Sequence, residues 1–363
     1  MNYVLPPGID REQNVQSATL VRLNEQSLAM RVCDLEDGDS RAANKTTGNQ
    51  DMRSNKKIRM FIHPEQRAGS TAALNNGDLV GFIRLGMVLT EYYYEFAIPF
   101  NVTPQGNYSP NDQSDREKVW PVANNLELSF ELLQYAKQQR NIAISNGTAT
   151  LTQEFTIADP TNPARTITIK GNPNLSTVRV ITLGVRNPKR TTGTPEDDGL
   201  SKCAEVWFNE LRLTDFDDQG GWAATTRITA RLADFGTVNI SGNMATPGFG
   251  SIEKKVSERL REDQRNYDVS AQLEIGKFFP ESTGIRLPLF WGYGETYITP
   301  QFNPLDPDIL LAPVLGNEAL GENVRDSIRG ATVDYTRRKS FNLTNIHKER
   351  GKGSSKKSYT WDI

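Results

Sequence analysis

The chain has 363 residues, and its 42 lysines and arginines nearly balance its 44 aspartates and glutamates, for a formal net charge of −2 at pH 7. This balance argues against a nucleic-acid-binding protein, which would carry a basic excess or a clustered basic face. Chains longer than about 250 to 300 residues tend to split into domains, so we expect two.

No run approaches the roughly 18 consecutive apolar residues that a membrane-spanning helix needs, which excludes an α-helical membrane protein. A transmembrane β-barrel stays possible, because its strands alternate in polarity and hardly register in hydropathy. The N-terminal sequence MNYVLPP lacks the charged and apolar regions of a secretory signal. The chain is therefore expected to be either cytoplasmic or a piece of a longer protein.

The two cysteines, Cys33 and Cys203, are too few for a disulfide-rich scaffold but leave one bridge possible. They fall near the two ends of the predicted first domain. In an oxidising compartment they could pair, and otherwise they are small buried residues. His63 and His347 lie far apart in sequence, with no cysteine or histidine at ligand spacing, so we expect no metal site.

Residues 1–217 are predicted to form a jelly-roll-like β-sandwich, because short β-branched and aromatic runs alternate with turn-forming clusters such as Asp37-Gly38-Asp39. One helix is predicted at residues 126–140, with Asn125 as its N-cap and an apolar stripe at helical spacing. Residues 103–119 contain two prolines and a glycine without periodicity and are predicted to be a loop. The predicted strands cover residues 15–23, 27–33, 58–63, 79–85, 92–100, 151–157, 166–170, 178–185 and 205–213.

Residues 218–363 have a different pattern. From Trp222, apolar and polar side chains alternate through two runs of about ten residues joined by a tight turn at Asp234-Phe235-Gly236, the length of a tilted membrane-spanning strand. The alternation returns at residues 267–275 and 285–293, and more weakly at 340–346. Polar stretches at 246–265 and 301–335 are predicted to be loops. Aromatic residues gather near the ends of these segments, as an interfacial girdle requires.

Charged residues on these predicted strands fall opposite the apolar ones: Arg227, Arg231, Asp268 and Glu274. Such charges are tolerated toward a watery lumen, whereas an arginine facing lipid costs roughly 2–4 kcal/mol at the bilayer midplane. About five strands cannot close a barrel, and an open strand edge in lipid leaves backbone groups unpaired. We therefore expect antiparallel strands that form part of a larger barrel, completed by strands from elsewhere.

The run CAEVWFNELRLTDFD at residues 203–217, followed by Gly220-Gly221-Trp222, resembles the SprA/Sov family, the giant outer-membrane proteins of the type IX secretion system and gliding motility in Bacteroidetes. Further blocks resemble the family in the same order. They are FIRLG at 82–86, YYYEFAIP at 92–99, LADFG at 232–236, GFGSI at 248–252, EIGKFFP at 274–280 and NPLDPD at 303–308. The resemblance covers nearly all of this chain but only a small part of the family's length, which implies an internal fragment.

The resemblance implies a non-catalytic segment of the barrel that forms the protein-conducting channel, in the outer membrane of a Gram-negative cell. The channel would support the export of cell-surface adhesins and gliding. The implied partners are the other strands of the full barrel, a PorV-like outer-membrane protein, a periplasmic plug protein, secreted cargo and membrane lipid. The sandwich would lie in the periplasm or at the cell surface. The resemblance assigns no catalytic, cofactor-binding or metal-binding residue.

The alternative is a soluble cell-surface module that binds carbohydrate or another partner. Residues 92–94 and the pair Trp207-Phe208 could offer aromatic faces to a sugar. Consecutive strand residues point to opposite faces, however, so at least one of each set belongs to the core. Packing of the aromatic side chains is the favoured interpretation.

The remaining charged clusters have plain structural interpretations. The acidic stretches at 34–39 and 196–199 lack the full ligand series of a calcium loop. Asp215, Asp217 and Asp218 are expected to form a solvated hinge rather than an acid/base site. The basic residues at 337–339 and 348–357 are expected to form a loop or turn beside lipid headgroups. No phosphate-binding loop, nucleophile elbow or zinc motif occurs, so we expect no enzyme.

Overall fold

The computed structural model describes residues 3–11, 13–14, 21–22, 25–67, 70, 72–193, 197–217, 219–255, 258–318 and 321–349. The protein is mainly β, and its sheets are antiparallel. It divides into two compact units, Met1–Asp217 and Asp218–Ile363, and the division falls where the pattern of the sequence changes. Among the described residues, none of the helices has the length and apolar character needed to cross a membrane.

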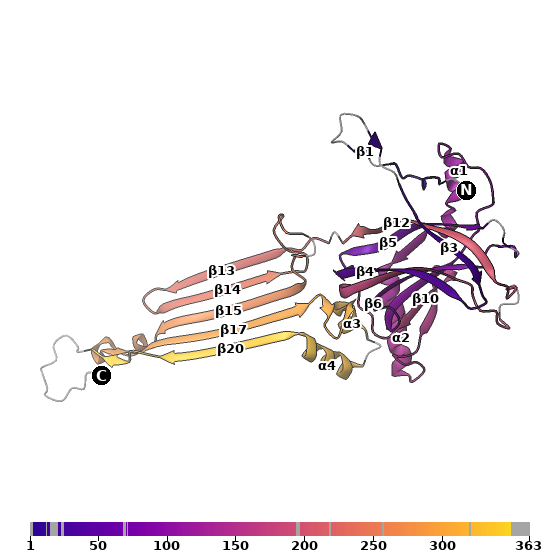
Figure 1. Ribbon diagram of the computed structural model, residues 1–363. Helices are drawn as coiled ribbons and strands as arrows, with labels where there is room; N and C mark the ends of the chain where they lie inside the picture. The colour runs from indigo at the N-terminus through magenta and orange to yellow at the C-terminus, as the bar shows by residue number, and fades with distance from the viewer. Residues whose placement is uncertain are drawn as a thin grey trace. The chain divides into compact units, whose positions relative to one another are not determined.

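The first unit contains two large sheets, drawn in indigo through magenta to salmon pink in Figure 1. One has the strand order β4 (Ser40–Gln50), β11 (Val178–Arg186), β6 (Val80–Val88), β7 (Tyr92–Pro99), β10 (Asn162–Lys170) and β9 (Phe155–Asp159). The other has the order β3 (Leu28–Leu35), β12 (Lys202–Phe216), β5 (Asn55–Gln66) and β8 (Leu126–Ser129). The short strands β1 (Gln13–Asn14) and β2 (Val21–Arg22) pair with each other. The predicted strand at 15–23 lies almost entirely outside the described residues.

The strand order is that of a jelly roll. With the β1–β2 pair and the β9–β10 hairpin set aside, eight strands follow one another along the described part of this unit. The first, eighth, third and sixth form one sheet, and the second, seventh, fourth and fifth form the other. Strands that follow one another along the chain thus cross between the two sheets, as they do in the two Greek keys of a jelly roll. The β9–β10 hairpin extends the larger sheet beyond β7.

The two sheets pack face to face over one hydrophobic core. Alternate residues of each strand point inward, because side chains along a strand alternate between its faces. Fully burying one such side chain contributes about 1.5–3 kcal/mol. Core residues from the smaller sheet include Leu35, Ile58, Ile62, Leu128 and Val206, and those from the larger sheet include Ile83, Phe96, Ile98, Ile167 and Val185.

The predicted helix at residues 126–140 is partly wrong. Residues Leu126–Ser129 form β8, which pairs with β5, and helix α2 runs from Phe130 to Ser145 with Ser129 rather than Asn125 at its N-cap. Leu126 and Leu128 are buried while Glu127 between them reaches Lys57 on β5 at 2.8 Å. This alternation suits a strand, so cross-strand pairing overrides the helical pattern.

Two other elements of the first unit differ from the prediction. The predicted loop at 103–119 ends in helix α1 (Gln113–Val119), where the Asp112 side chain accepts a hydrogen bond from the Ser114 backbone N–H. The described residues of this unit therefore form two α-helices rather than one, besides the short 3₁₀ helices η1 (Val122–Asn124) and η2 (Leu175–Thr177). Strand β4 was not predicted, because its sequence is polar and lacks alternation.

The second unit contains a five-stranded antiparallel meander, drawn in salmon to yellow in Figure 1. Its order is β13 (Ala223–Leu232), β14 (Gly236–Ala245), β15 (Glu262–Glu274), β17 (Pro288–Pro300) and β20 (Asp334–Leu343). Strand β20 therefore starts before the strand predicted at 340–346. Strand β15 starts within the loop predicted at 246–265, so that loop ends earlier than predicted. Around the meander lie η4 (Ile275–Phe278) and η5 (Glu281–Thr283), and the pairs β16 (Ile285–Arg286) with β21 (His347–Lys348) and β18 (Phe302–Asn303) with β19 (Asp306–Leu310).

The predicted loop at 301–335 is wrong in part, because it contains helices α3 (Leu311–Gly316) and α4 (Glu322–Thr332) as well as β18 and β19. Neither helix has a side-chain N-cap hydrogen bond. The sequence therefore lacked the strongest local signal of a helix start.

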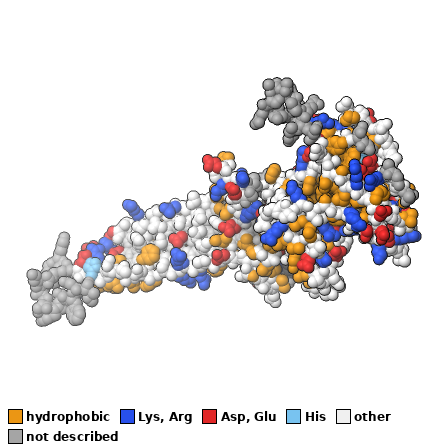
Figure 2. All heavy atoms as spheres, in the orientation of Figure 1, with side chains coloured by type: hydrophobic (Ala, Val, Ile, Leu, Met, Phe, Trp, Pro, Cys, Tyr) orange, Lys and Arg blue, Asp and Glu red, His pale blue; other side chains and the backbone are white. Residues whose placement is uncertain are grey.

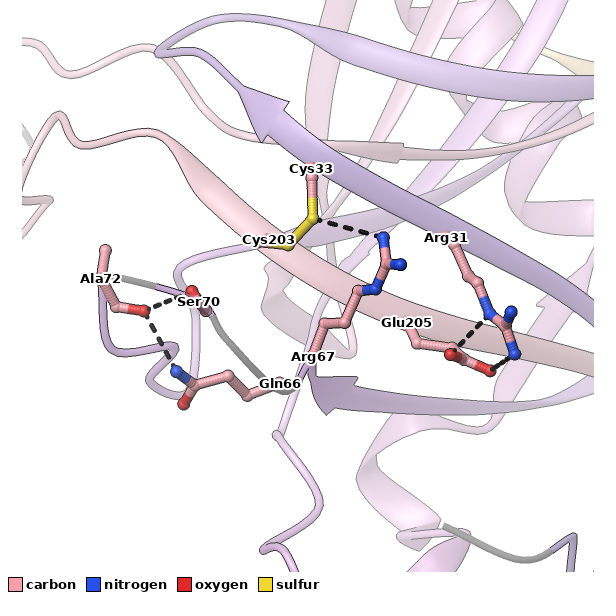
Figure 3. Close-up of a disulfide and its surroundings, with 8 residues drawn as sticks. All are labelled: Arg31, Cys33, Gln66, Arg67, Ser70, Ala72, Cys203 and Glu205. Atoms are coloured by element: carbon pink, nitrogen blue, oxygen red, sulfur yellow. Dashed lines mark hydrogen bonds and ion pairs between the residues drawn. A yellow bond between two sulfur atoms is a disulfide. The ribbon is translucent and has the colours of Figure 1, made fainter.

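Cys33 and Cys203 form a disulfide that joins β3 to β12, as Figure 3 shows. Strand β3 is at the edge of its sheet, and among the strands that the structure describes it pairs only with β12. The bridge therefore fastens an edge strand to the neighbour that holds it. Beside it, the buried Lys202 ammonium lies 2.8 Å from Asp78 and 2.6 Å from Asp198. Those two carboxylates compensate the charge of Lys202 in its buried position.

We expect the combined Cys33→Ser and Cys203→Ser substitutions to lower the free energy of unfolding by about 2–4 kcal/mol, because the bridge restricts the unfolded chain over a long loop. Urea denaturation followed by tryptophan fluorescence measures this change. Unmodified protein in dithiothreitol serves as the control and should unfold like the variant. An unchanged midpoint would show that the bridge does not stabilise the fold.

His63 lies in a second cluster of buried side chains, formed by Val4, Val119, Trp120 and Trp207. Its Nδ1 lies 2.6 Å from the Val119 carbonyl oxygen, and its ring centroid lies 4.3 Å from that of Trp207. Burial lowers the pKa of His63 to about 4, because the charged imidazolium loses its hydration.

This lowered pKa predicts a loss of stability in mild acid. The unfolded chain takes up a proton near pH 6.5 but the folded chain only near pH 4, so the stabilisation is complete above pH 6.5 and lost as the pH falls to 4. The loss is on the order of 3 kcal/mol. Urea midpoints measured between pH 7 and pH 4 should fall less steeply for His63→Gln, and an identical slope would contradict this assignment.

Candidate functional site

The five-stranded sheet of the second unit has two faces of different chemistry. Cross-strand register places apolar side chains in three successive rows on one face, which we call the apolar rows. They are Leu232–Gly236–Leu273–Leu289–Leu343, Ala230–Val238–Ala271–Trp291–Phe341 and Ile228–Ile240–Val269–Tyr293–Lys339. Only Lys339, at the end of the third row, is charged. Several of these side chains lie on the surface, with Ile228 55% and Phe341 67% exposed.

Tyrosines gather around one carboxylate at the edge of the apolar rows. Glu295 accepts hydrogen bonds from the hydroxyls of Tyr293 at 2.5 Å, Tyr335 at 2.7 Å and Tyr297 at 3.3 Å. The rings of Tyr297 and Tyr335 are 4.6 Å apart. We call these four residues the tyrosine cluster. Successive rows are two residues, or about 6.8 Å, apart, so the apolar rows and the cluster together span roughly 25 Å.

The opposite face is polar. Arg227, Arg231 and Asp268 lie on it, as predicted, with Asn239 and Ser270 between them in the register. In Figure 2, Lys and Arg and Asp and Glu side chains are scattered over the sheet, mostly among polar side chains and backbone and with some hydrophobic side chains between them. Glu274, the fourth predicted residue, lies at the strand end, where its Oε1 accepts a hydrogen bond from the Leu287 backbone N–H at 2.6 Å.

The outer strands of this sheet each have one neighbour. Within the described part of the chain, β13 pairs only with β14 and β20 only with β17. Two strand edges of ten residues each thus present their backbone groups outward.

A pocket of about 640 Å³ opens on the side of the apolar rows, near the tyrosine cluster. Its sheet side includes Asp263, Arg265 and Tyr297, and helix α3 contributes Ala312 and Pro313. The sequence analysis missed this pocket, because its α3 wall lies far along the chain from β15 and inside a predicted loop.

The aromatic residues considered for sugar binding are largely buried. Tyr94 and Phe208 belong to the core, and Trp207 packs in the cluster around His63. The Tyr93 ring lies beneath the Arg84 guanidinium at 4.2 Å. Only Tyr92, with 42% exposure, presents much of its ring to solvent.

A buried ion cluster lies on the larger sheet of the first unit, and the sequence analysis did not find it. Glu95, only 3% exposed, lies 2.6 Å from Arg84 and 2.9 Å from Arg186. Both guanidinium groups also lie over the Phe82 ring, at 5.3 and 4.8 Å. The two arginines compensate the carboxylate, so the arrangement is structural. It joins residues of three strands, which local sequence does not reveal.

The acidic turns serve the backbone and nearby cations. Asp37 accepts a hydrogen bond from the Arg190 backbone N–H, and Asp39 lies 3.4 Å from Arg41. Asp197 accepts from the Gly199 backbone N–H, and Asp198 pairs with Lys202. Glu196 lies outside the described residues. The part of the chain that the structure describes contains no cluster of three or more His, Cys, Asp or Glu side chains able to hold a metal ion.

Two of the three aspartates of the predicted hinge belong to the first unit. Asp215 lies 3.7 Å from the Lys57 ammonium, and the Asp217 backbone N–H donates to the Ser54 carbonyl, so both belong to the first unit. Asp218 and residues 350–357 lie outside the described residues. The expectation of a loop at 337–339 is wrong, because these residues lie within β20, where Arg337 pairs across the sheet with Glu295.

Comparison with known proteins places the chain in a family. No curated protein matches the sequence. Residues 1–315 match the SprA_N family model, described as motility related/secretion protein, and the match includes all of the first unit and most of the five-stranded sheet. The chain therefore belongs to the SprA_N family of motility-related and secretion proteins.

Proposed function

We propose that this chain is a non-catalytic segment of a giant outer-membrane β-barrel that forms the protein-conducting channel of type IX secretion. In that role it supports export of cell-surface adhesins and gliding motility. Family membership supports a motility- or secretion-related role in the cell envelope. The observation that carries the finer proposal is the two-faced sheet of the second unit, with exposed apolar rows on one side and arginines on the other.

The proposed mechanism is mechanical. The apolar rows contact lipid, the tyrosine cluster lies at the membrane interface, and the polar face keeps the lumen hydrated. The tyrosine cluster borders the apolar rows as an aromatic girdle borders the apolar band of outer-membrane barrels. Strand edges cannot remain unpaired in lipid, so strands from the rest of the barrel pair with β13 and β20. The sandwich shapes or covers one mouth of the channel.

The proposed partners beyond the barrel's own strands follow from the family resemblance. They are a PorV-like outer-membrane protein, a periplasmic plug protein and secreted cargo. The alternative role, a soluble carbohydrate-binding module, has less support, because burial of Tyr93, Tyr94 and Trp207 leaves no aromatic platform among them.

Loop lengths suggest which end of the sheet faces the cell exterior. At one end of the sheet, three residues join β13 to β14 and residues 275–287 join β15 to β17, whereas the longer connections, residues 246–261 and 301–333, lie at the other end. The chain also enters β13 at the end with the long connections, where the Trp222 backbone N–H donates to the Thr246 hydroxyl. Outer-membrane barrels have short periplasmic turns and longer extracellular loops. We therefore place the junction with the sandwich on the extracellular side.

Arginine substitutions test the orientation of the two faces. We expect Ile240→Arg and Leu273→Arg to reduce the amount of protein retained in the outer membrane after alkaline washing, because each places a charge among the apolar rows at a cost of about 2–4 kcal/mol. Asn239→Arg is the matched control on the polar face and should leave retention unchanged. Normal retention of both apolar-row variants would refute the lipid-facing assignment.

Cysteine labelling tests the sidedness. Ser251 and Ser282 are both exposed and lie at opposite ends of the sheet. In intact cells, a membrane-impermeant maleimide should label Ser251→Cys, whereas Ser282→Cys should react only after the outer membrane is permeabilised. The reverse pattern would place the long connections and the junction in the periplasm.

A further inference from the structure

The pocket beside helix α3 lies where the apolar rows give way to polar residues. Its volume of about 640 Å³ falls within the roughly 300–1,000 Å³ of small-molecule sites. Asp263, Arg265 and Tyr267 of β15 line it together with Tyr297 of β17. Ala312 and Pro313 of α3 line another side of the pocket.

The pocket presents opposite charges side by side. Arg265 Nε donates to Asp263 Oδ1 at 2.9 Å, and Arg265 Nη2 donates to Oδ2 at 3.3 Å. The side chains remain 51% and 26% exposed, so both can reach a ligand. A guanidinium suits phosphate, because its planar donors match phosphate oxygens. A carboxylate suits an ammonium. The pair therefore complements a group in which phosphate and ammonium are neighbours.

Aromatic rings favour the same ligand. The faces of Tyr267 and Tyr297 carry the negative part of the ring quadrupole, which attracts organic cations. Tyr297 also packs against Tyr335 and is held in place by its hydroxyl, which donates to Glu295. A ligand ammonium between Asp263 and these rings would be stabilised by both.

The register continues from this pocket directly onto the apolar rows. Tyr267 lies one row from Val269, and Val269 lies one row from Ala271. Each row is about 6.8 Å, so an acyl chain leaving the pocket can follow the apolar face.

We propose that this pocket binds the zwitterionic head group of a membrane lipid, with phosphate at Arg265 and ammonium at Asp263, and that the acyl chains of the lipid lie on the apolar rows. The inference rests on the proposed membrane location. The shared chemistry is a phosphoethanolamine group, which a glycerophospholipid or a modified glycolipid can carry.

Lipid retention in the native complex tests the proposal. The full-length protein is extracted from its outer membrane in mild detergent and washed with lipid-free detergent, and the retained lipids are identified and counted by mass spectrometry. Ala312→Trp, which fills the pocket, and Arg265→Gln should each reduce the retained phosphoethanolamine lipid about tenfold, the loss expected for one charge-assisted contact. Arg338→Gln, on the polar face, is the matched control and should retain as much as the unmodified protein.

A second variant tests the head-group selectivity. Asp263→Asn keeps the phosphate partner but removes the partner of the ammonium, so the ratio of zwitterionic to anionic lipid should fall. The mass of the retained lipid distinguishes a glycerophospholipid from a glycolipid. If the Ala312→Trp variant retained as much lipid as the unmodified protein, the pocket would not be the binding site. If Asp263→Asn left the ratio of zwitterionic to anionic lipid unchanged, the assignment of a zwitterionic head group would be wrong. Absence of the chain from alkaline-washed outer membranes would instead refute the proposed function.

Discussion

Alternation of side chains between the two faces of each strand is the constraint on which both units depend. In the jelly roll, inward residues such as Ile83 and Val206 meet in one core, and the outward side of the larger sheet holds the compensated Glu95. In the second unit, no second sheet packs against the meander among the described residues. Both of its faces therefore need side chains suited to their surroundings, and over the three apolar rows the register places apolar residues on one side and Arg227, Arg231 and Asp268 on the other.

Strand edges are the second constraint, because each carries backbone groups that need partners. In the jelly roll, the edge strand β3 is fastened to β12 by the disulfide, and the edge strand β4 is polar and carries Lys45. In the meander, β13 carries Arg227 and Arg231 and β20 carries Arg337, Arg338 and Lys339, but no disulfide fastens either edge strand among the described residues. That difference agrees with the proposal that its edges are paired by strands from the rest of a barrel.

Much of the fold could be predicted from the sequence. Most strands with β-branched and aromatic residues were found, as was the change of pattern near residue 217. The errors have physical causes. Strand β4 lacks alternation and is held by β11, and β8 has a helix-like sequence but pairs with β5. Helices α3 and α4 lack side-chain N-caps and lie in a stretch that reads as a polar loop.

The sequence by itself determined which residues share a face of each strand, and it carried the blocks that indicate the family, because both signals are local. Only the tertiary structure paired Cys33 with Cys203 and surrounded Glu295 with three tyrosine hydroxyls. It alone brought helix α3 beside Arg265. These arrangements depend on strand register and on contacts between distant segments, and local periodicity cannot encode which distant partner each face will meet.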